Sequence, residues 1–407
     1  MTPPQDIQRS PQPNGRGNDP CATFIGRART LFDDKALDHV KAWKAAHPGA
    51  LAIGHMPIYT PRPLLEALGC LPVAVFGGGE EVDIIRGDSY FQSYICHIPR
   101  STIELALSGT YDVLDGMVFP SICDVIRNLS GMWKMLFPDR YAAYLDLPQN
   151  FNSSIGGRFY LHELRRIAND LTARGALPLD DDRLCRALAD ENRRRRAIAR
   201  LDALRRTDPW RCPASEAYLL VRAGAGLLAA EHAELLEGFV EAAPRRSGRP
   251  LDNVRVVLAG SFCEQPPLDL IVALEKAGCD IVDDDFQLGL RTIEGDINEE
   301  APDPLAALAQ AFLDQGRATA SRYIDKDEKG RALIDQVQAA QADGVVFAAA
   351  SFCDPALLDQ PMLETALAKA GVPFTSFKFA ENNGQFQTIR EQAGAFSDSV
   401  KLWGAAH

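Results

Sequence analysis

The chain has 407 residues, with 43 Lys and Arg against 55 Asp and Glu, so its formal net charge is −12. This acidic balance disfavours a general electrostatic attraction to nucleic acid or to an anionic membrane. No stretch approaches the roughly 18 consecutive apolar residues of a membrane-spanning helix. Nine cysteines, in a chain whose start lacks the apolar segment of a secretory signal, indicate a reducing compartment, and we expect a cytoplasmic protein.

The first part of the chain has the pattern of an α/β domain. Residues 1–33 are predicted as a flexible lead-in, because the beginning is rich in Pro, Gln, Asn and Gly. Over 34–160, short apolar runs alternate with amphipathic stretches, which is typical of parallel strands joined by crossover helices. The predicted strands are 50–53, 71–76, 113–119 and 141–145, and the predicted helices are 64–68 and 127–137.

Residues 161–243 carry Leu, Ala, Arg and Glu at helical spacing without a strand signal, which predicts a helical connector. Its arginine run, 193–196, is interpreted as a solvated helix face that pairs with nearby carboxylates. A polar Gly/Pro-containing linker, 244–250, opens a second α/β domain over 244–407. The predicted fold is therefore α/β, with two doubly wound parallel-sheet domains joined by a helical connector. The second domain has predicted strands at 254–258, 281–282, 345–349 and 372–377, and predicted helices at 268–277, 304–312 and 355–370.

A short Ser-x-Cys-acid pattern occurs three times, around Cys123, Cys263 and Cys353. Each copy directly follows an apolar strand and precedes a helix. In a doubly wound sheet this position lies at the carboxyl end of a strand, where ligands bind, so the cysteines of both halves are expected to face one cleft. Thiolates near helix amides suit an iron–sulfur cluster, whereas the alternative is that these residues fill strand ends as small hydrophobes. The remaining cysteines outside this context are interpreted as structural: Cys21, Cys70, Cys185, Cys212 and Cys279.

The absence of several catalytic and nucleotide-binding motifs disfavours nucleotide hydrolysis, metalloprotease and serine hydrolase activity in this chain. The sequence has no GxxxxGK[ST] phosphate loop, no GxGxxG before a helix, no HExxH and no GxSxG. His55 follows a strand and could donate a proton to a substrate or only form loop hydrogen bonds. Glu264 and Asp354 could relay protons, but capping of the helices that follow them is favoured. The acidic run 283–285 is not expected to bind a cation.

Five segments resemble one known superfamily when they are taken together. They are GHMPIYTPRP (54–63), DSYFQSYIC (88–96), FPSICD (119–124), GSFCE (260–264) and SFCD (351–354). Their order is similar to that of the benzoyl-CoA reductase and 2-hydroxyacyl-CoA dehydratase superfamily, most closely the gamma (C) type of subunit of the ATP-dependent benzoyl-CoA reductases. The resemblance extends over about 34–395.

The resemblance implies a [4Fe–4S] cluster in the cleft between the two domains, held by Cys96, Cys123 and Cys353. The repeat alone would select Cys263 and miss Cys96. By resemblance Cys263 lies on the cleft wall outside the ligand set, while Cys96 precedes a predicted helix at 101–107, and a helix N-terminus suits a thiolate.

The resemblance also implies a function. It indicates an iron–sulfur subunit that takes part in the ferredoxin-linked reduction of benzoyl-CoA to a cyclohexadiene carbonyl-CoA in anaerobic aromatic degradation. A sister cluster-bearing subunit of the beta (B) type and ATP-binding activator subunits of the alpha and delta types are the implied partners, with ATP and Mg bound on the activators. His55, His97 and Glu264 are the candidates for proton delivery. The alternatives are a subunit of a 2-hydroxyacyl-CoA dehydratase and a noncatalytic electron-relay cluster protein.

Overall fold

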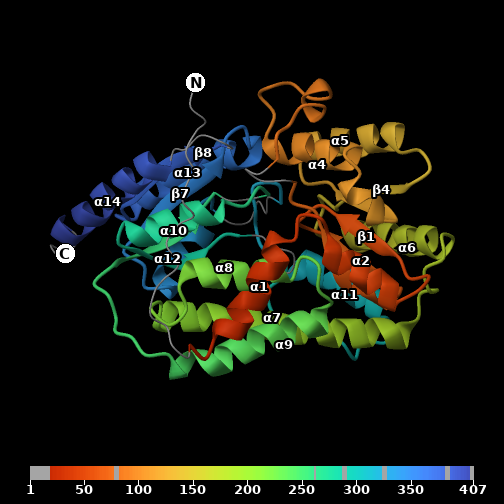
Figure 1. Ribbon diagram of the computed structural model, residues 1–407, viewed down its shortest axis with the longest axis horizontal. Coiled ribbons are helices and arrows are strands. Elements are labelled where there is room, and N and C mark those ends of the chain that lie inside the picture. Colours follow the sequence, from red (N-terminus) through yellow and green to blue (C-terminus); the bar gives the residue numbers. More distant parts are fainter. Residues whose placement is uncertain are drawn as a thin grey trace, which may run out of the picture.

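The computed structural model describes residues 19–77, 82–260, 263–286, 291–322, 328–380 and 386–403. Within these residues the strands form two separate parallel sheets of four strands, ordered β2-β1-β3-β4 and β6-β5-β7-β8 (Figure 1). The first sheet contains β1 (Ala52–His55), β2 (Leu71–Ala74), β3 (Gly116–Pro120) and β4 (Tyr141–Leu145). The second contains β5 (Val254–Ala259), β6 (Cys279–Asp284), β7 (Gly344–Ala350) and β8 (Phe374–Phe379). The predicted α/β class with parallel sheets is confirmed.

The central strands are buried on both faces, as expected when helices cover a parallel sheet. Every residue of β1, β3 and β7 is buried. The helices between the strands of the first sheet are α3 (Arg62–Ala67), α4 (His97–Leu107) and α5 (Asp124–Leu136). Those of the second sheet and the C-terminus are α10 (Leu268–Lys276), α11 (Pro304–Asp314), α12 (Arg331–Ala339), α13 (Asp354–Lys369) and α14 (Phe386–Trp403). Helix α12 lies in a segment for which the sequence analysis predicted no helix.

The N-terminal segment differs from the prediction. Residues 22–33, expected to be part of a flexible lead-in, form α1 (Ala22–Asp33), which is followed by α2 (Asp38–Ala46). Helix α1 contacts α8 and α9. Its start is held because Arg246 forms a 2.7 Å ion pair with Asp19, and Cys21 is fully buried beside Phe239. These contacts order a segment whose composition alone suggested disorder.

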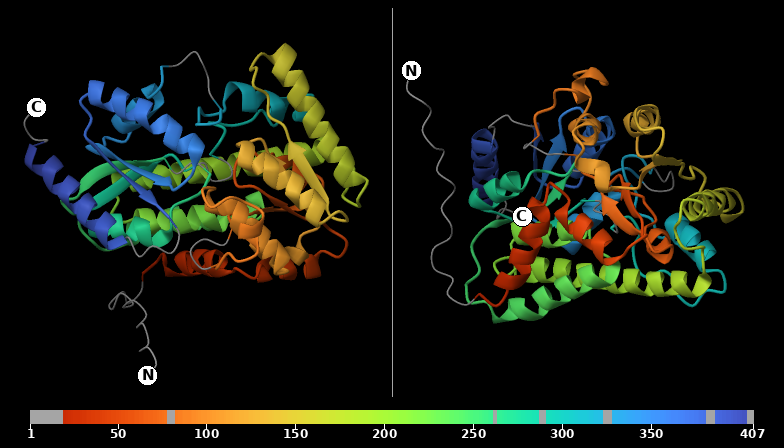
Figure 2. Two further views of the ribbon diagram at one scale, coloured as in Figure 1. Left: turned by 90° about the horizontal axis from the view of Figure 1, so that it is seen from above. Right: turned by 45° about the vertical axis from the view of Figure 1, so that its right-hand side comes forward.

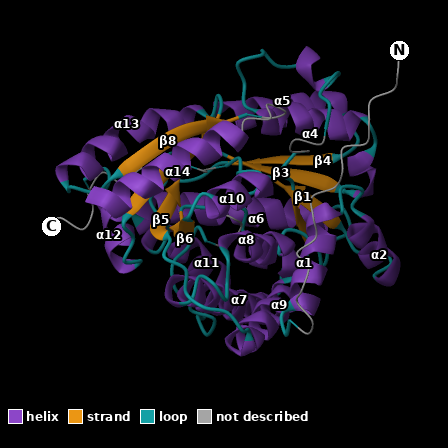
Figure 3. Ribbon diagram, turned by 60° about the vertical axis from the view of Figure 1, so that its left-hand side comes forward, coloured by secondary structure: helices purple, strands orange, loops and turns teal. Residues whose placement is uncertain are grey.

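Four helices follow the first sheet in the chain: α6 (Arg158–Thr172), α7 (Asp181–Thr207), α8 (Ala214–Ala223) and α9 (Ala229–Ala242). The long helix α7 contacts α3 of the first half and β6 of the second. Figures 1 and 2 show α7 and α9 running side by side beneath both sheets, and Figure 3 shows the two sheets apart from each other above them. Packing of α7 against both halves therefore links the two sheets in space, in addition to the covalent connection along the chain.

The arginine run of α7 is only partly a solvated face. Arg194 is fully buried and pairs with buried Glu191 at 2.9 Å. Arg193 pairs with Glu237 on α9 at 2.6 Å. The prediction of a solvated face is wrong for Arg194, because α7 packs against α3 and α9 and one side of the run faces inward.

Among the described residues, the helices all lack the combination of length and apolar character that spanning a membrane requires.

Candidate functional site

Three cysteines occupy the same position relative to a helix. Cys96 is the N-cap residue of α4, Cys123 that of α5 and Cys353 that of α13. A helix N-terminus favours negative charge, which opposes the effect of burial on the pKa of a thiol at such a position. Cys263 differs, because α10 begins only after a loop and has Pro267 as its N-cap. Helix position therefore distinguishes Cys263 from the three cysteines that the family resemblance selects.

Strand order explains how two of these cysteines come to lie at the ends of their sheets. In each sheet, successive strands are added first toward one edge and then toward the other. The switch point lies between β1 and β3 in the first sheet and between β5 and β7 in the second. Cys123 lies between β3 and α5, and Cys353 between β7 and α13. The carboxyl ends of the strands at such a switch point form the usual binding crevice of a doubly wound sheet.

The four cysteines at this place influence one another electrostatically. Burial raises the pKa of Cys263 well above its ordinary value, and Cys123, Cys353 and Cys96 raise it further. Burial likewise raises the pKa of Cys96 strongly, and Glu264, Cys353 and Cys123 add to this effect. Each thiolate therefore disfavours the next, so several can be ionised together only when positive charge is bound among them.

Backbone amides act on two of the sulfur atoms. Burial raises the pKa of Cys123, while the N–H groups of Ile126 and Val125 in α5 lower it. Burial raises the pKa of Cys353 to about 12, while the N–H groups of Ala356 and Cys263 lower it. Hydrogen bonds of this kind stabilise the thiolate form and tune an iron–sulfur cluster.

The chemistry of the donor set is that of an iron–sulfur cluster, whose ligands are thiolates. Among the described residues, no group of three or more His, Cys, Asp or Glu could hold a metal ion. Sulfur donors at three helix N-termini are the ligands that such a cluster requires.

His97 and Glu264 line a groove of about 210 Å³. His97 is the first residue of α4, directly after Cys96, and Glu264 follows Cys263. The guanidinium of Arg222 lies over the Phe76 ring at 3.8 Å on the same groove wall. Further lining residues include Phe32, Lys35, Tyr218 and Phe379. The groove thus combines aromatic faces with cations beside the cysteine site.

His55 lies elsewhere. It ends β1, is fully buried and does not line this groove. Its Nδ1 is 2.7 Å from the Met56 carbonyl oxygen, so Nδ1 is the protonated nitrogen. Burial and the nearby Arg62 lower the pKa of His55 to about 3, so the ring is neutral at physiological pH. The structure therefore places His97 and Glu264 on the wall of this groove, and His55 at the buried carboxyl end of β1.

The expected helix-capping roles of Glu264 and Asp354 are wrong. Asp354 is the first residue of α13, and the N-cap position belongs to Cys353. Glu264 does not cap α10, which begins after Pro266 and Pro267. Burial raises the pKa of Glu264 to about 7, and the backbone amides of His97 and Ile98 in α4 lower it in part. Ser261 and Phe262 of the same motif lie outside the described residues.

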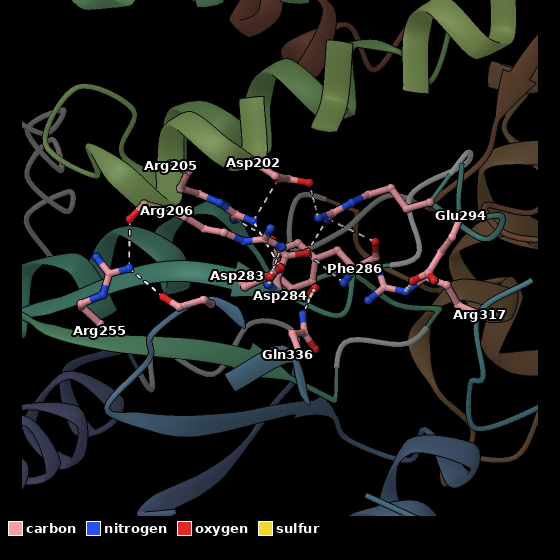
Figure 4. A network of polar contacts seen from close by, with 12 residues as sticks. Asp202, Arg205, Arg206, Arg255, Asp283, Asp284, Phe286, Glu294, Arg317 and Gln336 are labelled. Carbon is pink, nitrogen blue, oxygen red and sulfur yellow. Dashed lines mark hydrogen bonds and ion pairs between the residues drawn. The ribbon is translucent and has the colours of Figure 1, made fainter. Parts of the chain in front are cut away.

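Asp283 and Asp284, at the end of β6, form ion pairs with arginine side chains. Asp284 pairs with Arg205 at 2.6 Å and also with Arg291, and Asp283 pairs with Arg206 (Figure 4). These side chains come from α7, β6 and the segment after it. The carboxylates of Asp283 and Asp284 are therefore neutralised by arginines within the fold.

Cys96 is the site residue that the repeat pattern misses, because it follows a loop and not a strand. The useful signal is a helix start that comes earlier than predicted: α4 begins at His97, whereas the sequence analysis placed a helix from 101. Pro99 lies in the first turn of α4 but at its third position, so the preference for Pro at the first helical position would have placed the N-cap at Ile98 and not at Cys96.

Comparison with known proteins gives a consistent result. The family described as 2-hydroxyglutaryl-CoA dehydratase, D-component, matches residues 57–400. The C-type subunit of the benzoyl-CoA reductase from Thauera aromatica is 46% identical over 383 residues, which cover 94% of this chain and 99% of that protein.

Dehydratase subunits are more distant. The (R)-phenyllactyl-CoA dehydratase beta subunit of Clostridium sporogenes is 25% identical, covering 86% of this chain and 92% of that protein. The (R)-2-hydroxyglutaryl-CoA dehydratase beta subunit of Acidaminococcus fermentans is 27% identical, covering 86% and 93%.

Proposed function

Because the chain belongs to the 2-hydroxyglutaryl-CoA dehydratase D-component family, we propose that it is the iron–sulfur subunit of an ATP-dependent benzoyl-CoA reductase. The observation that carries this choice is the 46% identity to the C-type subunit of a benzoyl-CoA reductase over nearly the full length of both proteins. The dehydratase subunits are only 25% and 27% identical. The enzyme would be an oxidoreductase that converts benzoyl-CoA into a cyclohexadiene carbonyl-CoA with electrons from ferredoxin.

In this proposal Cys96, Cys123 and Cys353 hold a [4Fe–4S] cluster between an N-terminal α/β domain (34–160) and a C-terminal one (244–407), with 161–243 as connector. Such a cluster, when bound, supplies single electrons at low potential. The chain's own part is to provide thiolates at three helix N-termini, amide hydrogen bonds to the sulfur atoms of Cys123 and Cys353, and burial that limits access of water.

Partner subunits complete the reaction. The chain carries no phosphate-loop motif, which supports ATP and Mg binding on separate activator subunits of the alpha and delta types. The related proteins are themselves named as subunits, which supports a hetero-oligomer with a sister cluster-bearing subunit of the beta (B) type. His97 and Glu264 line one groove, which supports them as candidates for proton delivery. His55 does not line that groove, and its Nδ1 is bonded to the Met56 carbonyl oxygen.

The decisive test is to determine iron, acid-labile sulfide and low-temperature EPR spectra of the anoxically prepared complex, with and without benzoyl-CoA. About four irons and four sulfides for this chain, with ring reduction and ATP consumed in every turnover, are expected. Elimination of water from a 2-hydroxyacyl-CoA with only catalytic ATP would identify a dehydratase. Iron without any acyl-CoA turnover would identify a noncatalytic relay, and absence of iron would refute the cluster.

A further inference from the structure

Helix α8 is hydrogen-bonded to elements of both halves of the molecule. Near its start, Ser215 donates to Glu275 in α10, from its backbone N–H at 3.0 Å and from its Oγ at 2.8 Å. At its end, the carbonyl oxygen of the C-cap residue Gly224 accepts a 2.7 Å hydrogen bond from the buried guanidinium of Arg62 in α3. One end of α8 is therefore held by the second half and the other end by the first.

Two side chains of α8, one helical turn apart, form consecutive hydrogen bonds. Tyr218 is buried, and its hydroxyl donates a 2.9 Å hydrogen bond to the carbonyl oxygen of Pro266. The guanidinium of Arg222 donates a 3.0 Å hydrogen bond to the same hydroxyl oxygen. Because arginine has no acceptor, the proton of the Tyr218 hydroxyl must point toward Pro266. Consecutive hydrogen bonds of this kind strengthen each other.

Arg222 extends this connection to the first sheet. Its guanidinium lies over the ring of Phe76, just after β2, at 3.8 Å from the ring centre. A cation above an aromatic face is attracted by the ring. Phe76, Arg222, Tyr218 and Pro266 thus connect the end of β2 with the loop after β5. All four residues line the groove to which His97 also contributes.

The loop of residues 263–267 has few backbone donors of its own. Pro266 and Pro267 have no N–H group, so neither can donate a backbone hydrogen bond. The carbonyl oxygen of Pro267 accepts hydrogen bonds from amides of α10, whereas that of Pro266 accepts the one from Tyr218. Tyr218 therefore bonds this loop to a helix other than the one that follows it.

We propose that Tyr218 is a positioning residue, oriented by Arg222, that fixes the loop of residues 263–267 in the groove wall that it shares with His97. The loop carries Glu264, so the hydrogen bond to Pro266 determines how close Glu264 and His97 lie. The inference rests on the proposed function only where it concerns the cluster. The hydrogen bonds themselves are a property of the chain without iron.

The experiment compares Tyr218→Phe, Arg222→Met, the double variant and the matched control Tyr141→Phe in the full chain, prepared without oxygen. Phenylalanine keeps the ring of Tyr218 and removes only its hydroxyl. Tyr141 in β4 is also buried, and its hydroxyl has no hydrogen-bond partner within the described part of the chain. The two readouts are amide hydrogen exchange of peptides covering residues 263–274 and the reduction potential of the cluster, from a titration followed by EPR.

Tyr218→Phe leaves a buried carbonyl oxygen without its donor, so exchange of 263–274 should become on the order of ten times faster. Arg222→Met should accelerate it about threefold, because the hydroxyl remains but is no longer oriented. The double variant should match Tyr218→Phe within about twofold, since Arg222 acts on the loop through that hydroxyl. Tyr141→Phe should leave exchange unchanged. Unchanged exchange in Tyr218→Phe, or additive effects in the double variant, would overturn the proposal.

The reduction potential separates positioning from a general loss of stability. A loosened loop admits water, which stabilises the more negative reduced cluster, so Tyr218→Phe should raise the potential and Tyr141→Phe should not. Faster exchange with an unchanged potential would contradict a positioning role. Should Tyr218→Phe fail to fold, Arg222→Met must still accelerate exchange of this loop, and its failure to do so contradicts the proposal. If the unmodified chain contains no iron, the proposed function fails, while hydrogen exchange still determines whether Tyr218 holds the loop.

Discussion

The guanidinium of Arg205 in α7 donates a 2.6 Å hydrogen bond to the carboxylate of Asp284 at the end of β6. Both side chains are buried. Burial alone would raise the pKa of Asp284, but Arg291 and Arg205 lower it below its ordinary value. The carboxylate is therefore ionised at neutral pH, and this ion pair fastens the long helix α7 to the second sheet.

Replacement of Arg205 with methionine should destabilise the fold by about 3 kcal/mol, because it leaves buried carboxylates with less compensating charge. Arg196→Met is the control. Arg196 pairs with Asp296 at an exposed position, so its loss should cost about 1 kcal/mol or less. Urea unfolding of both variants measures the difference. Equal midpoints for the two variants would show that the buried pair contributes nothing beyond a surface pair.

Much of the architecture follows from local sequence patterns, because each strand has a short apolar run that a parallel sheet buries on both faces. The runs around β3 and β7 therefore lead directly to Cys123 and Cys353. Helix α1 could not be predicted in the same way, since its stability comes from contacts with α8 and α9, which lie far away in sequence.

The part of the site that sequence reasoning missed depends on contacts between the halves. Glu264 was expected to cap the helix that follows it, which is the local solution. In the structure the backbone amides of His97 and Ile98 in α4 influence the pKa of its carboxyl group, and a sequence pattern cannot pair these residues with it. The strand-end pattern did not include Cys96, because a loop and not a strand directly precedes α4.

Protonation of His55 should destabilise the protein in mild acid. Burial and Arg62 lower the pKa of this residue to about 3, whereas an unfolded histidine has a pKa of about 6.5. The unfolded chain therefore binds the proton first, so the stabilisation is complete above pH 6.5 and is lost as the pH falls toward 3. At pH 5 this corresponds to about 2 kcal/mol for His55.

The measurement is the free energy of unfolding of the unmodified chain and of His55→Gln between pH 5 and pH 8. The variant should be less stable at pH 8 and should lose less stability than the unmodified chain as the pH falls to 5. Parallel curves for the two proteins would show that His55 does not take up this proton.

The three N-cap cysteines should be required for iron, and the other cysteines should not. Cys123→Ser or Cys353→Ser should lose at least about half of the iron while keeping the circular dichroism spectrum, because serine keeps the size of the side chain but is a poor ligand for a cluster. Cys185→Ser, in α7, should retain all of it. Cys263→Ser should also retain iron, since Cys263 caps no helix and its hydrogen bond to Cys353 comes from the backbone. Full iron content in Cys123→Ser would refute the ligand assignment.

Glu104 should hold the loop that leads to Cys96. Its carboxylate Oε2 accepts hydrogen bonds from the backbone amides of Ile85, Arg86 and Gly87 at 2.9, 2.6 and 2.9 Å. Burial raises the pKa of Glu104, but these three amides outweigh that effect and lower it. The carboxylate is thus charged, and it ties the loop to α4, the helix that begins directly after Cys96.

Glu104→Ala removes all three acceptor contacts, and each hydrogen bond to a charged group contributes about 1.5–3 kcal/mol. Trypsin should then cleave after the exposed Arg86 at least about a hundredfold faster, because local opening of the loop governs cleavage. Iron release should accelerate as well. Glu294→Ala, which removes an exposed partner of Arg317, is the matched control and should change neither rate. If cleavage after Arg86 is equally slow in Glu104→Ala and in the control, Glu104 does not hold this loop.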